Sequence, residues 1–485
     1  MTHDPQEQMN NDTSPIDDPR HDQVESALEA LQGFVLQARW FSGKGRDGQL
    51  GGLEQPADWI VAPGGNAPAV RPEYVTVVYP DDSHEYYQLL VSYHPEPVDG
   101  CLIGPAMEPE LGYAHDAPRD PEAMRAVVAA ILAGSQVPHV WMESLPDGAK
   151  LRGDLEPRVF GGEQSNTNVL LGDVALMKIF RKLEVGPNLD IQMHDALGRA
   201  RVSSAARLYG WVSGMLTPFS DETWTDGAEA PEPQRVDLMM ISELLRDAQD
   251  GWELACEQAG QGVGFAENAA ALGVALAEVH TALADTFDTS TLDGAAIAAT
   301  MRERLATAAA QAPALQPMTE QLAAVFDGLE QGKVKAQRVH GDFHLGQTLL
   351  TPGGWKIIDF EGEPMKSFAE RQLPDSPLRD VAGMLRSFGY ATSVFDEPTG
   401  AAATQWLQEA RTAFLDAYGR HAGSIDPAAL AAYEADKAVY EVVYETRNRP
   451  NWVEIPLSAL EALAPGADTT STPTSGAADA AEQEN

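Results

Sequence analysis

One stretch of the chain, residues 337–364, constrains its fold more than any other. It reads QRVHGDFHLGQTLLTPGGWKIIDFEGEP. The pattern is strand, loop and strand, and each half carries one aspartate at a loop end. Asp342 lies in the first loop, and Asp359 follows the apolar pair Ile357 and Ile358. The sequence therefore predicts a hairpin that brings two carboxylates close together.

Two carboxylates in this arrangement suit phosphoryl transfer. One carboxylate orients the attacking hydroxyl, and another holds the metal that bridges the nucleotide phosphates. The protein-kinase catalytic loop spaces its Asp and its metal-binding Asn five positions apart, and an Asp-Phe-Gly ligand follows on the next hairpin. Asp342 and Gln347 have this spacing, and Asp359 opens an Asp-Phe-Glu segment. We therefore predict Asp342 as the catalytic base and Gln347, Asp359 and Glu361 as metal ligands.

A hydrolase is the competing interpretation of the same hairpin. His340 and His344 flank Asp342, and two carboxylates with two histidines also suit metal-assisted hydrolysis. The complete set of residues, in this order, favours a phosphotransferase.

Composition excludes several classes of function. A formal net charge of -40 leaves little room for the basic face that nucleic-acid binding needs. The only two cysteines are far apart in sequence, which suits a reducing cytoplasm. The N-terminal residues lack the pattern of a signal peptide, and no stretch is long and apolar enough for a membrane span. We therefore expect a cytoplasmic protein with no nucleic-acid or membrane partner.

At 485 residues the chain is too long for one core, and several domains are expected. A sheet-rich region precedes a helix-rich one, and the hairpin lies in the second. The predicted divisions are a disordered tail at 1–22, an N-terminal module at 23–110, a sheet-containing lobe at 111–245, a helical lobe at 246–464 and a disordered tail at 465–485.

The sheet-containing lobe carries a candidate nucleotide site. The polar loop 161–168 offers backbone N–H groups and the side chains of Ser165, Asn166 and Thr167 to phosphates, although a plain hairpin tip would look the same. Lys178 lies inside an apolar strand, where a cation needs an anionic partner. We assign Lys178 to the ATP phosphates.

Two further features of this site are less defined. The acidic partner of Lys178 is Asp190 or Asp195, and the sequence does not separate them. Glu243 and Leu245 follow a predicted strand at 237–242. They form the natural hinge, where backbone groups would contact the adenine edge.

A second cluster of polar residues lies near the C-terminus. Glu441, Glu445 and Arg449 recur every four residues and share one helix face, Pro450 ends that helix, and Trp452 follows. Carboxylates, an arginine and an aromatic face suit the hydroxyls and the C–H face of a pyranose. The spacing fits an ordinary ladder of salt bridges equally well.

Together these motifs resemble the actinobacterial maltokinases and the related glucosamine kinases, which are similar to aminoglycoside and choline phosphotransferases. The resemblance covers nearly the whole folded chain and rests on residues 40–46, 162–167, 176–181, 339–347, 358–364 and 440–456. It implies an α+β, bilobal, protein-kinase-like fold with an N-terminal cap domain, and it implies ATP and Mg²⁺ as cofactors. It also implies a sugar-binding set: His344, Glu441, Tyr444, Glu445, Asn448, Arg449 and Trp452.

The resemblance favours maltokinase activity, in which maltose and ATP give maltose 1-phosphate and ADP for glycogen synthesis. The first alternative is a glucosamine kinase that makes glucosamine 6-phosphate. The second is a catalytically silent kinase-like binding protein, although the presence of Lys178, Asp342 and Asp359 weighs against it. We expect the protein to act as a monomer or a homodimer.

Overall fold

The computed structural model describes residues 19–54, 59–134, 140–161, 165–219 and 232–464. They form two compact units. Unit 1 comprises residues 1–192 and 207–246, and unit 2 comprises residues 193–206 and 247–485. The predicted tail 465–485 and most of the predicted tail 1–22 lie outside the described residues. The first helix begins at Pro19, inside the segment 1–22 that was predicted to be a disordered tail.

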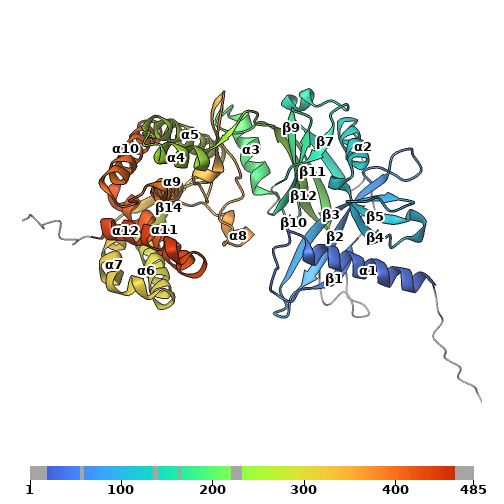
Figure 1. The fold of residues 1–485 in the computed structure, drawn as a ribbon, viewed down its shortest axis with the longest axis horizontal. Helices are drawn as coiled ribbons and strands as arrows, with labels where there is room; N and C mark the ends of the chain where they lie inside the picture. The colour runs from blue at the N-terminus through green and yellow to red at the C-terminus, as the bar shows by residue number, and fades with distance from the viewer. Residues whose placement is uncertain (1–18, 55–58, 135–139, 162–164, 220–231, 465–485) are drawn as a thin grey trace, which may run out of the picture. The chain divides into compact units, whose positions relative to one another are not determined.

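Unit 1 contains two antiparallel sheets, coloured blue to green in Figure 1. The strand order in the first is β1-β2-β3-β5-β4, and β10 also pairs with β3. The order in the second is β6-β11-β12-β9-β8-β7. The strands of the first sheet are β1 (Gln49–Glu54), β2 (Ala69–Val78), β3 (His84–His94), β4 (Leu102–Pro105), β5 (Tyr113–Asp116) and β10 (Lys182–Leu183). Those of the second are β6 (Val140–Ser144), β7 (Pro157–Val159), β8 (Asn166–Leu171), β9 (Ala175–Phe180), β11 (Leu208–Leu216) and β12 (Gln234–Glu243).

Helices complete unit 1. Helix α1 (Pro19–Gln37) packs on β4, and α2 (Pro121–Leu132) packs on β7 and β2. The side chain of Asp120 caps α2 by accepting from two backbone N–H groups, with Pro121 at the first helical position. Helix α3 (Leu189–Arg199) begins in unit 1 and ends in unit 2.

A buried arginine joins the two sheets of unit 1. Arg181, only 1 % exposed, donates to Asp116 of β5 (2.7 Å) and to Thr167 of β8 (2.7 Å). Its guanidinium also lies 5.0 Å from the ring centroid of Trp40. A buried charge needs such partners, so Arg181 fixes the N-terminal module against the second sheet. Trp40 and Phe41, which belong to the motif at residues 40–46, are core residues of that module.

Unit 2 is mainly helical, in green to red in Figure 1. Its helices are α4 (Gly251–Gly260), α5 (Ala266–Thr286), α6 (Gly294–Gln311), α7 (Thr319–Asp327), α8 (Phe368–Arg371), α9 (Leu378–Ala391), α10 (Ala401–Ala422), α11 (Pro427–Asn448) and α12 (Glu454–Leu463). Its short strands are β13 (Gln249–Asp250), β14 (Ser290–Asp293), β15 (Lys333–Ala336), β16 (Thr348–Thr351) and β17 (Gly354–Ile357). One hydrophobic cluster contains residues of all these helices except α8, and residues of β15, β16 and β17 belong to it or pack against it.

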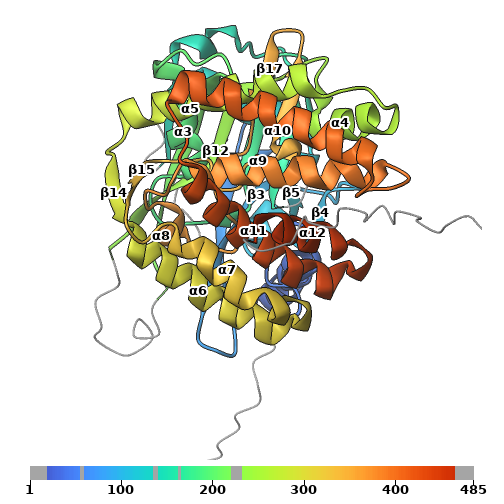
Figure 2. The same cartoon turned by 90° about the vertical axis from the view of Figure 1, so that its left-hand side faces the viewer.

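Helix α9 occupies the middle of unit 2. It packs on α11 on one side and on α10 on the other, and α10 packs along α5 (Figure 2). The hairpin β16–β17 follows residues 340–347, the predicted catalytic loop, which is called the catalytic loop below, and β13 extends the hairpin to three strands. Residues 337–347 form no strand, so the predicted hairpin corresponds to β16 and β17, with Asp342 before it and Asp359 after it. The loop that carries Asp342 lies against the buried helix α9.

Within the described residues, no helix has both the length and the apolar composition needed to cross a bilayer.

Candidate active site

The catalytic loop is held from behind by Asp380 of α9. Asp380 is fully buried, and its two oxygens accept the backbone N–H groups of His340 (2.7 Å) and Gly341 (2.8 Å). Burial alone would raise the pKa of Asp380, but the hydrogen bond and charge of His280, 2.9 Å away, hold it below its usual value. A carboxylate with this many donors is a rigid anchor.

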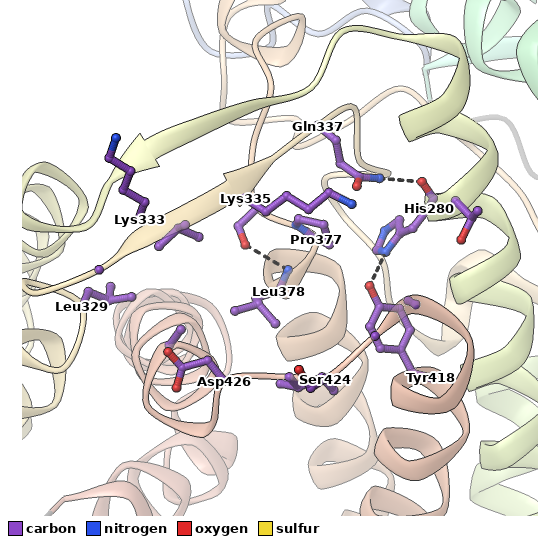
Figure 3. A pocket seen from close by; sticks show the side chains of 18 of the residues that line it. His280, Leu329, Lys333, Lys335, Gln337, Pro377, Leu378, Tyr418, Ser424 and Asp426 are labelled. Atoms are coloured by element: carbon purple, nitrogen blue, oxygen red, sulfur yellow. Dashed lines mark hydrogen bonds between the residues drawn. The ribbon is translucent and has the colours of Figure 1, made fainter.

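His280 also forms a wall of a small cavity of ≈ 220 Å³. Figure 3 shows the hydroxyl of Tyr418 pointing at the imidazole of His280 (2.8 Å) and the amide of Gln337 donating to the His280 carbonyl (2.7 Å). These three side chains are buried. The cavity wall is therefore part of the support that reaches the catalytic loop through Asp380.

Asp380→Asn is expected to lower the free energy of unfolding by about 3 kcal/mol, since an amide donor would then face buried N–H donors. The pKa of Asp380 is lower in the folded protein than in the unfolded chain. The stabilisation that the Asp380 carboxylate gives the fold is therefore complete above the ordinary aspartate pKa, and it is lost as the pH falls through the lower pKa of the folded protein. Urea unfolding checks the result. Glu409→Gln, an exposed change on α10, is the control. Equal stability of the two variants would contradict the anchoring role.

Two glycines permit the close packing of this loop. Gly341 has φ +89°, in the left-handed region that favours glycine, and a Cβ there would lie 3.2 Å from Gly362. A Cβ on Gly383 of α9 would lie 2.4 Å from the carbonyl oxygen of Phe343. The loop backbone therefore touches α9 directly, and Asp342 projects from a fixed frame.

The predicted metal ligands are close neighbours. The amide Nε2 of Gln347 donates to Asp359 Oδ2 (3.2 Å), and the backbone N–H of Ile358 donates to the Gln347 carbonyl (3.1 Å). Asp359 has φ +65°, a conformation that costs energy for a residue with a side chain and that recurs at functional sites. Glu361 is two residues further on, and its carbonyl accepts from Arg371 (2.9 Å). Carboxylate and amide oxygens fit the hard cation Mg²⁺.

In unit 1, Lys178 has a clear acidic partner. Its ammonium lies 2.8 Å from Asp190 Oδ2, and the two side chains are 15 % and 3 % exposed. Asp190 is in the first turn of α3. Asp195, the other candidate, pairs instead with Arg199 on the same helix. The choice that the sequence left open is therefore resolved in favour of Asp190.

The polar loop before Lys178 differs in detail from the prediction. Residues 162–164 lie outside the described residues. Ser165 is exposed, but Asn166 and Thr167 are buried at the start of β8. The Thr167 hydroxyl accepts from Arg181, so its side chain serves packing within unit 1. Of the three predicted side chains, Ser165 keeps the exposed position that the prediction requires.

The predicted hinge coincides with a boundary in the chain. The second segment of unit 1 ends at residue 246, just after Glu243 and Leu245. The backbone N–H of Glu243 donates to Arg207 O (2.8 Å), and that of Leu244 donates to Val174 O (3.1 Å). These two donors therefore stabilise the end of β12. Because both are already paired, other backbone groups of this segment would have to contact the adenine.

A larger cavity of ≈ 530 Å³ opens beside Asp342 in unit 2. Its lining comes from the catalytic loop, the segment after β17, α4, α9, α11 and the turn after α11. The lining residues are Trp252, Asp342, His344, Glu363, Pro364, Met365, Gly383, Ser387, Tyr390, Lys437, Tyr440, Glu441, Tyr444, Glu445, Arg449 and Trp452. Six of the seven residues predicted to bind sugar are among them. Asn448 is not, because its amide turns back to the Tyr444 carbonyl (2.9 Å).

The predicted helix face of α11 is confirmed, and its charges are paired. Arg449 forms a two-point contact with Glu445 (2.6 and 2.9 Å), which also accepts from the Tyr390 hydroxyl (3.0 Å). Glu441 accepts from Arg386 of α9 (2.8 Å). Burial raises the pKa of Glu441, against the opposing charge of Arg386. Helix α11 ends at Asn448, just before Pro450.

Aromatic side chains form the apolar part of the cavity. Tyr390 and Trp452 stack with ring centroids 6.1 Å apart, and Tyr440 and Tyr444 stack at 6.4 Å. Tyr440 and Tyr444 remain 42 % and 44 % exposed. His344 lies beside Asp342, and burial lowers the pKa of its imidazole. The cavity thus offers aromatic faces and carboxylates together, as a sugar requires.

The sequence interpretation missed several lining residues. Lys437 and Tyr440 precede Glu441 by four and one positions, and Tyr440 is four before Tyr444. Extending the helical spacing by one turn would have found Lys437. Trp252 and Tyr390 come from distant helices, and no local pattern connects them to Asp342.

A buried anchor for the loop, the predicted base Asp342, the predicted oxygen ligands and a Lys–Asp pair are the features expected of a kinase-like phosphotransferase. The Phosphotransferase enzyme family model matches residues 246–433, and the Maltokinase N-terminal cap domain model matches residues 34–120. The chain belongs to this phosphotransferase family, in the maltokinase-like group that carries the cap domain. The predicted fold class and family are therefore confirmed, as is phosphotransfer to a hydroxyl acceptor.

Curated relatives agree with this membership, and a solved structure has the same fold. The chain is 30 % identical over 324 residues to a glucosamine kinase of Mycolicibacterium smegmatis, covering 62 % of this chain and 78 % of the relative. It is 29 % identical over 330 residues to a glucosamine kinase of Streptacidiphilus jiangxiensis, covering 62 % and 72 %. A solved glucosamine kinase in complex with glucosamine, ADP and inorganic phosphate has the same fold, with a TM-score of 0.66 and 24 % identity over 90 % of this chain and 99 % of the other.

Proposed function

We propose that this protein is an ATP- and Mg²⁺-dependent kinase that phosphorylates a hydroxyl group of a small sugar. The observation that carries the proposal is the position of Asp342 at a cavity lined by carboxylates and aromatic faces. Asp342 would orient the acceptor hydroxyl and accept its proton. Lys178 would bind ATP phosphates, and Gln347, Asp359 and Glu361 would hold Mg²⁺, which neutralises charge on the phosphates.

We rank glucosamine first among the acceptors. Four carboxylates line the cavity, Asp342, Glu363, Glu441 and Glu445, against two basic side chains. Arg386, which pairs with Glu441, raises the basic groups to three, so the carboxylates stay in excess. An acidic cavity stabilises an ammonium group. The 30 % identical relative is itself named a glucosamine kinase.

Maltose, the acceptor favoured by the sequence motifs, is the second candidate. The cavity of ≈ 530 Å³ exceeds the roughly 300 Å³ at which pockets for drug-sized ligands begin. The exposed Tyr440 and Tyr444 could face a second glucose ring. In that case the product would be maltose 1-phosphate, a donor for α-glucan assembly.

ADP release, measured across glucosamine, maltose, glucose and N-acetylglucosamine, separates the candidates. We expect the highest kcat/KM with glucosamine. A clear preference for maltose would reverse the ranking. ATP binding without ADP release on any acceptor would favour a silent kinase-like binding protein.

Glu445→Gln tests the same question at one residue. With glucosamine as acceptor, KM should rise steeply, by roughly ten-fold or more, and most at pH values where the amine is charged, because a charge-assisted contact is lost. With maltose the loss should be modest, since a neutral hydrogen bond remains. The control is Glu454→Gln, an exposed carboxylate outside the lining. A KM for glucosamine that does not change would count against glucosamine as the acceptor.

A further inference from the structure

Lys437 is the one lysine among the described lining residues of the acceptor cavity. It lies beside Asp342, the proposed catalytic base. Its ammonium is 3.4 Å from Asp342 Oδ1 and 3.4 Å from Glu363 Oε2. The three side chains are 18 to 26 % exposed. Asp342 belongs to the catalytic loop, Glu363 follows β17, and Lys437 comes from α11. One cation therefore joins three separate segments at the reacting end of the cavity.

Neighbouring carboxylates stabilise the positive charge of Lys437. Burial opposes the ammonium, but the carboxylates of Asp342, Glu363 and Glu441 outweigh this effect and raise its pKa. Without Lys437, Asp342 and Glu363 would be two neighbouring carboxylates with mutual repulsion. Neither contact is as short as a typical charge-assisted hydrogen bond. The ammonium is shared between the two carboxylates, so it can hold both in place at once.

We propose that Lys437 is a positioning and specificity-determining residue that holds Asp342 in place and keeps positively charged groups away from the reacting end of the acceptor cavity. The proposal rests on the proposed sugar-kinase function. The acceptor hydroxyl must come within hydrogen-bond reach of Asp342, which brings it close to the Lys437 ammonium. A second cation at that place is repelled, at a cost of roughly ten-fold or more in affinity.

For an aminosugar, the position of Lys437 determines the orientation of the sugar in the cavity. Glu441 and Glu445 lie one and two helical turns beyond Lys437 on α11. An ammonium group is attracted toward these carboxylates and repelled from the base. The aminosugar then presents a neutral hydroxyl to Asp342, so its oxygen and not its nitrogen is aligned for transfer. A neutral sugar experiences no such selection.

Variants at Lys437 test the holding role. Lys437→Met keeps the length of the side chain and removes its charge, and should lower kcat roughly ten-fold, whereas Lys437→Arg should retain most of the activity. In Lys437→Ala, methylammonium should restore part of kcat, because a small cation can take the place between Asp342 and Glu363. Tetramethylammonium at the same concentration is the salt control. No restoration in a variant that melts at the wild-type temperature would overturn the holding role.

The exclusion of positively charged groups from the reacting end, called the charge filter below, is tested with 6-amino-6-deoxyglucose. This sugar carries its ammonium at the carbon that bears the phosphate in glucosamine 6-phosphate. Its dissociation constant, measured by calorimetry, should fall roughly ten-fold in Lys437→Met relative to wild type, while that of glucose should change little. Equal dissociation constants in the two proteins would overturn the filter. Wild-type turnover on the sugar panel reports separately on the proposed function, because the calorimetric comparison requires no catalysis.

Discussion

Asp342→Asn is expected to lower kcat by roughly 10²-fold or more, the usual size of a general acid–base contribution. The change is nearly isosteric and leaves the backbone contacts of the loop with Asp380 in place. An amide cannot take up the proton of the acceptor hydroxyl, and it weakens the contact with Lys437. The affinity for ATP should change little, because the predicted phosphate and metal contacts belong to other residues.

The matched control for this variant is Glu363→Gln. Glu363 shares the Lys437 ammonium with Asp342 but is not the proposed base, so its loss should cost much less in kcat. Steady-state ADP release and calorimetric binding of ATP measure both effects. If Asp342→Asn keeps near-normal turnover, or if the two variants lose the same activity, Asp342 is not the base.

The catalytic hairpin could be predicted from sequence because its chemistry is contiguous. Asp342, Gln347 and Asp359 lie within a short stretch, and strand pairing of β16 with β17 brings its two ends together. The same holds for the face of α11, where a spacing of four places Glu441, Glu445 and Arg449 in one cavity. In both cases the spatial arrangement follows from the spacing of residues within one short segment.

The supporting elements could not be predicted because their polar residues are buried. Helix α9 is buried along almost its whole length, its polar residues Asp380 and Arg386 included, so the hydrophobic pattern of its sequence does not reveal that these two residues are buried. Their partners His280 and Glu441 lie 100 and 55 residues away in sequence. Only the tertiary fold pairs them.

Strand β2 shows the same difficulty in the N-terminal module. It begins at Ala69 and includes Pro72. Arg71 and Glu73, which flank that proline, resemble a turn in sequence. In the structure they pair with each other at 3.2 Å in a buried strand. Burial of both faces removes the alternation from which a strand is usually recognised.

Asp359→Ala is expected to abolish activity and to weaken nucleotide binding only when Mg²⁺ is present. The variant removes the carboxylate that, with Gln347 and Glu361, would anchor the metal bridging the phosphates. Calorimetric titration of ADP with and without Mg²⁺ measures the two affinities. Wild type should gain affinity from Mg²⁺, and the variant should not.

The backbone at this position requires a second variant. Asp359 has φ +65°, a conformation that costs alanine about 1 to 2 kcal/mol and that asparagine tolerates better. Asp359→Asn therefore removes the negative charge while sparing the backbone, and it should show the same selective loss of Mg²⁺-dependent binding. Equal weakening with and without Mg²⁺ in both variants would indicate a damaged fold rather than a lost metal ligand. Full Mg²⁺-dependent affinity in Asp359→Asn would remove Asp359 from the metal site, and the assignment would then pass to Glu361.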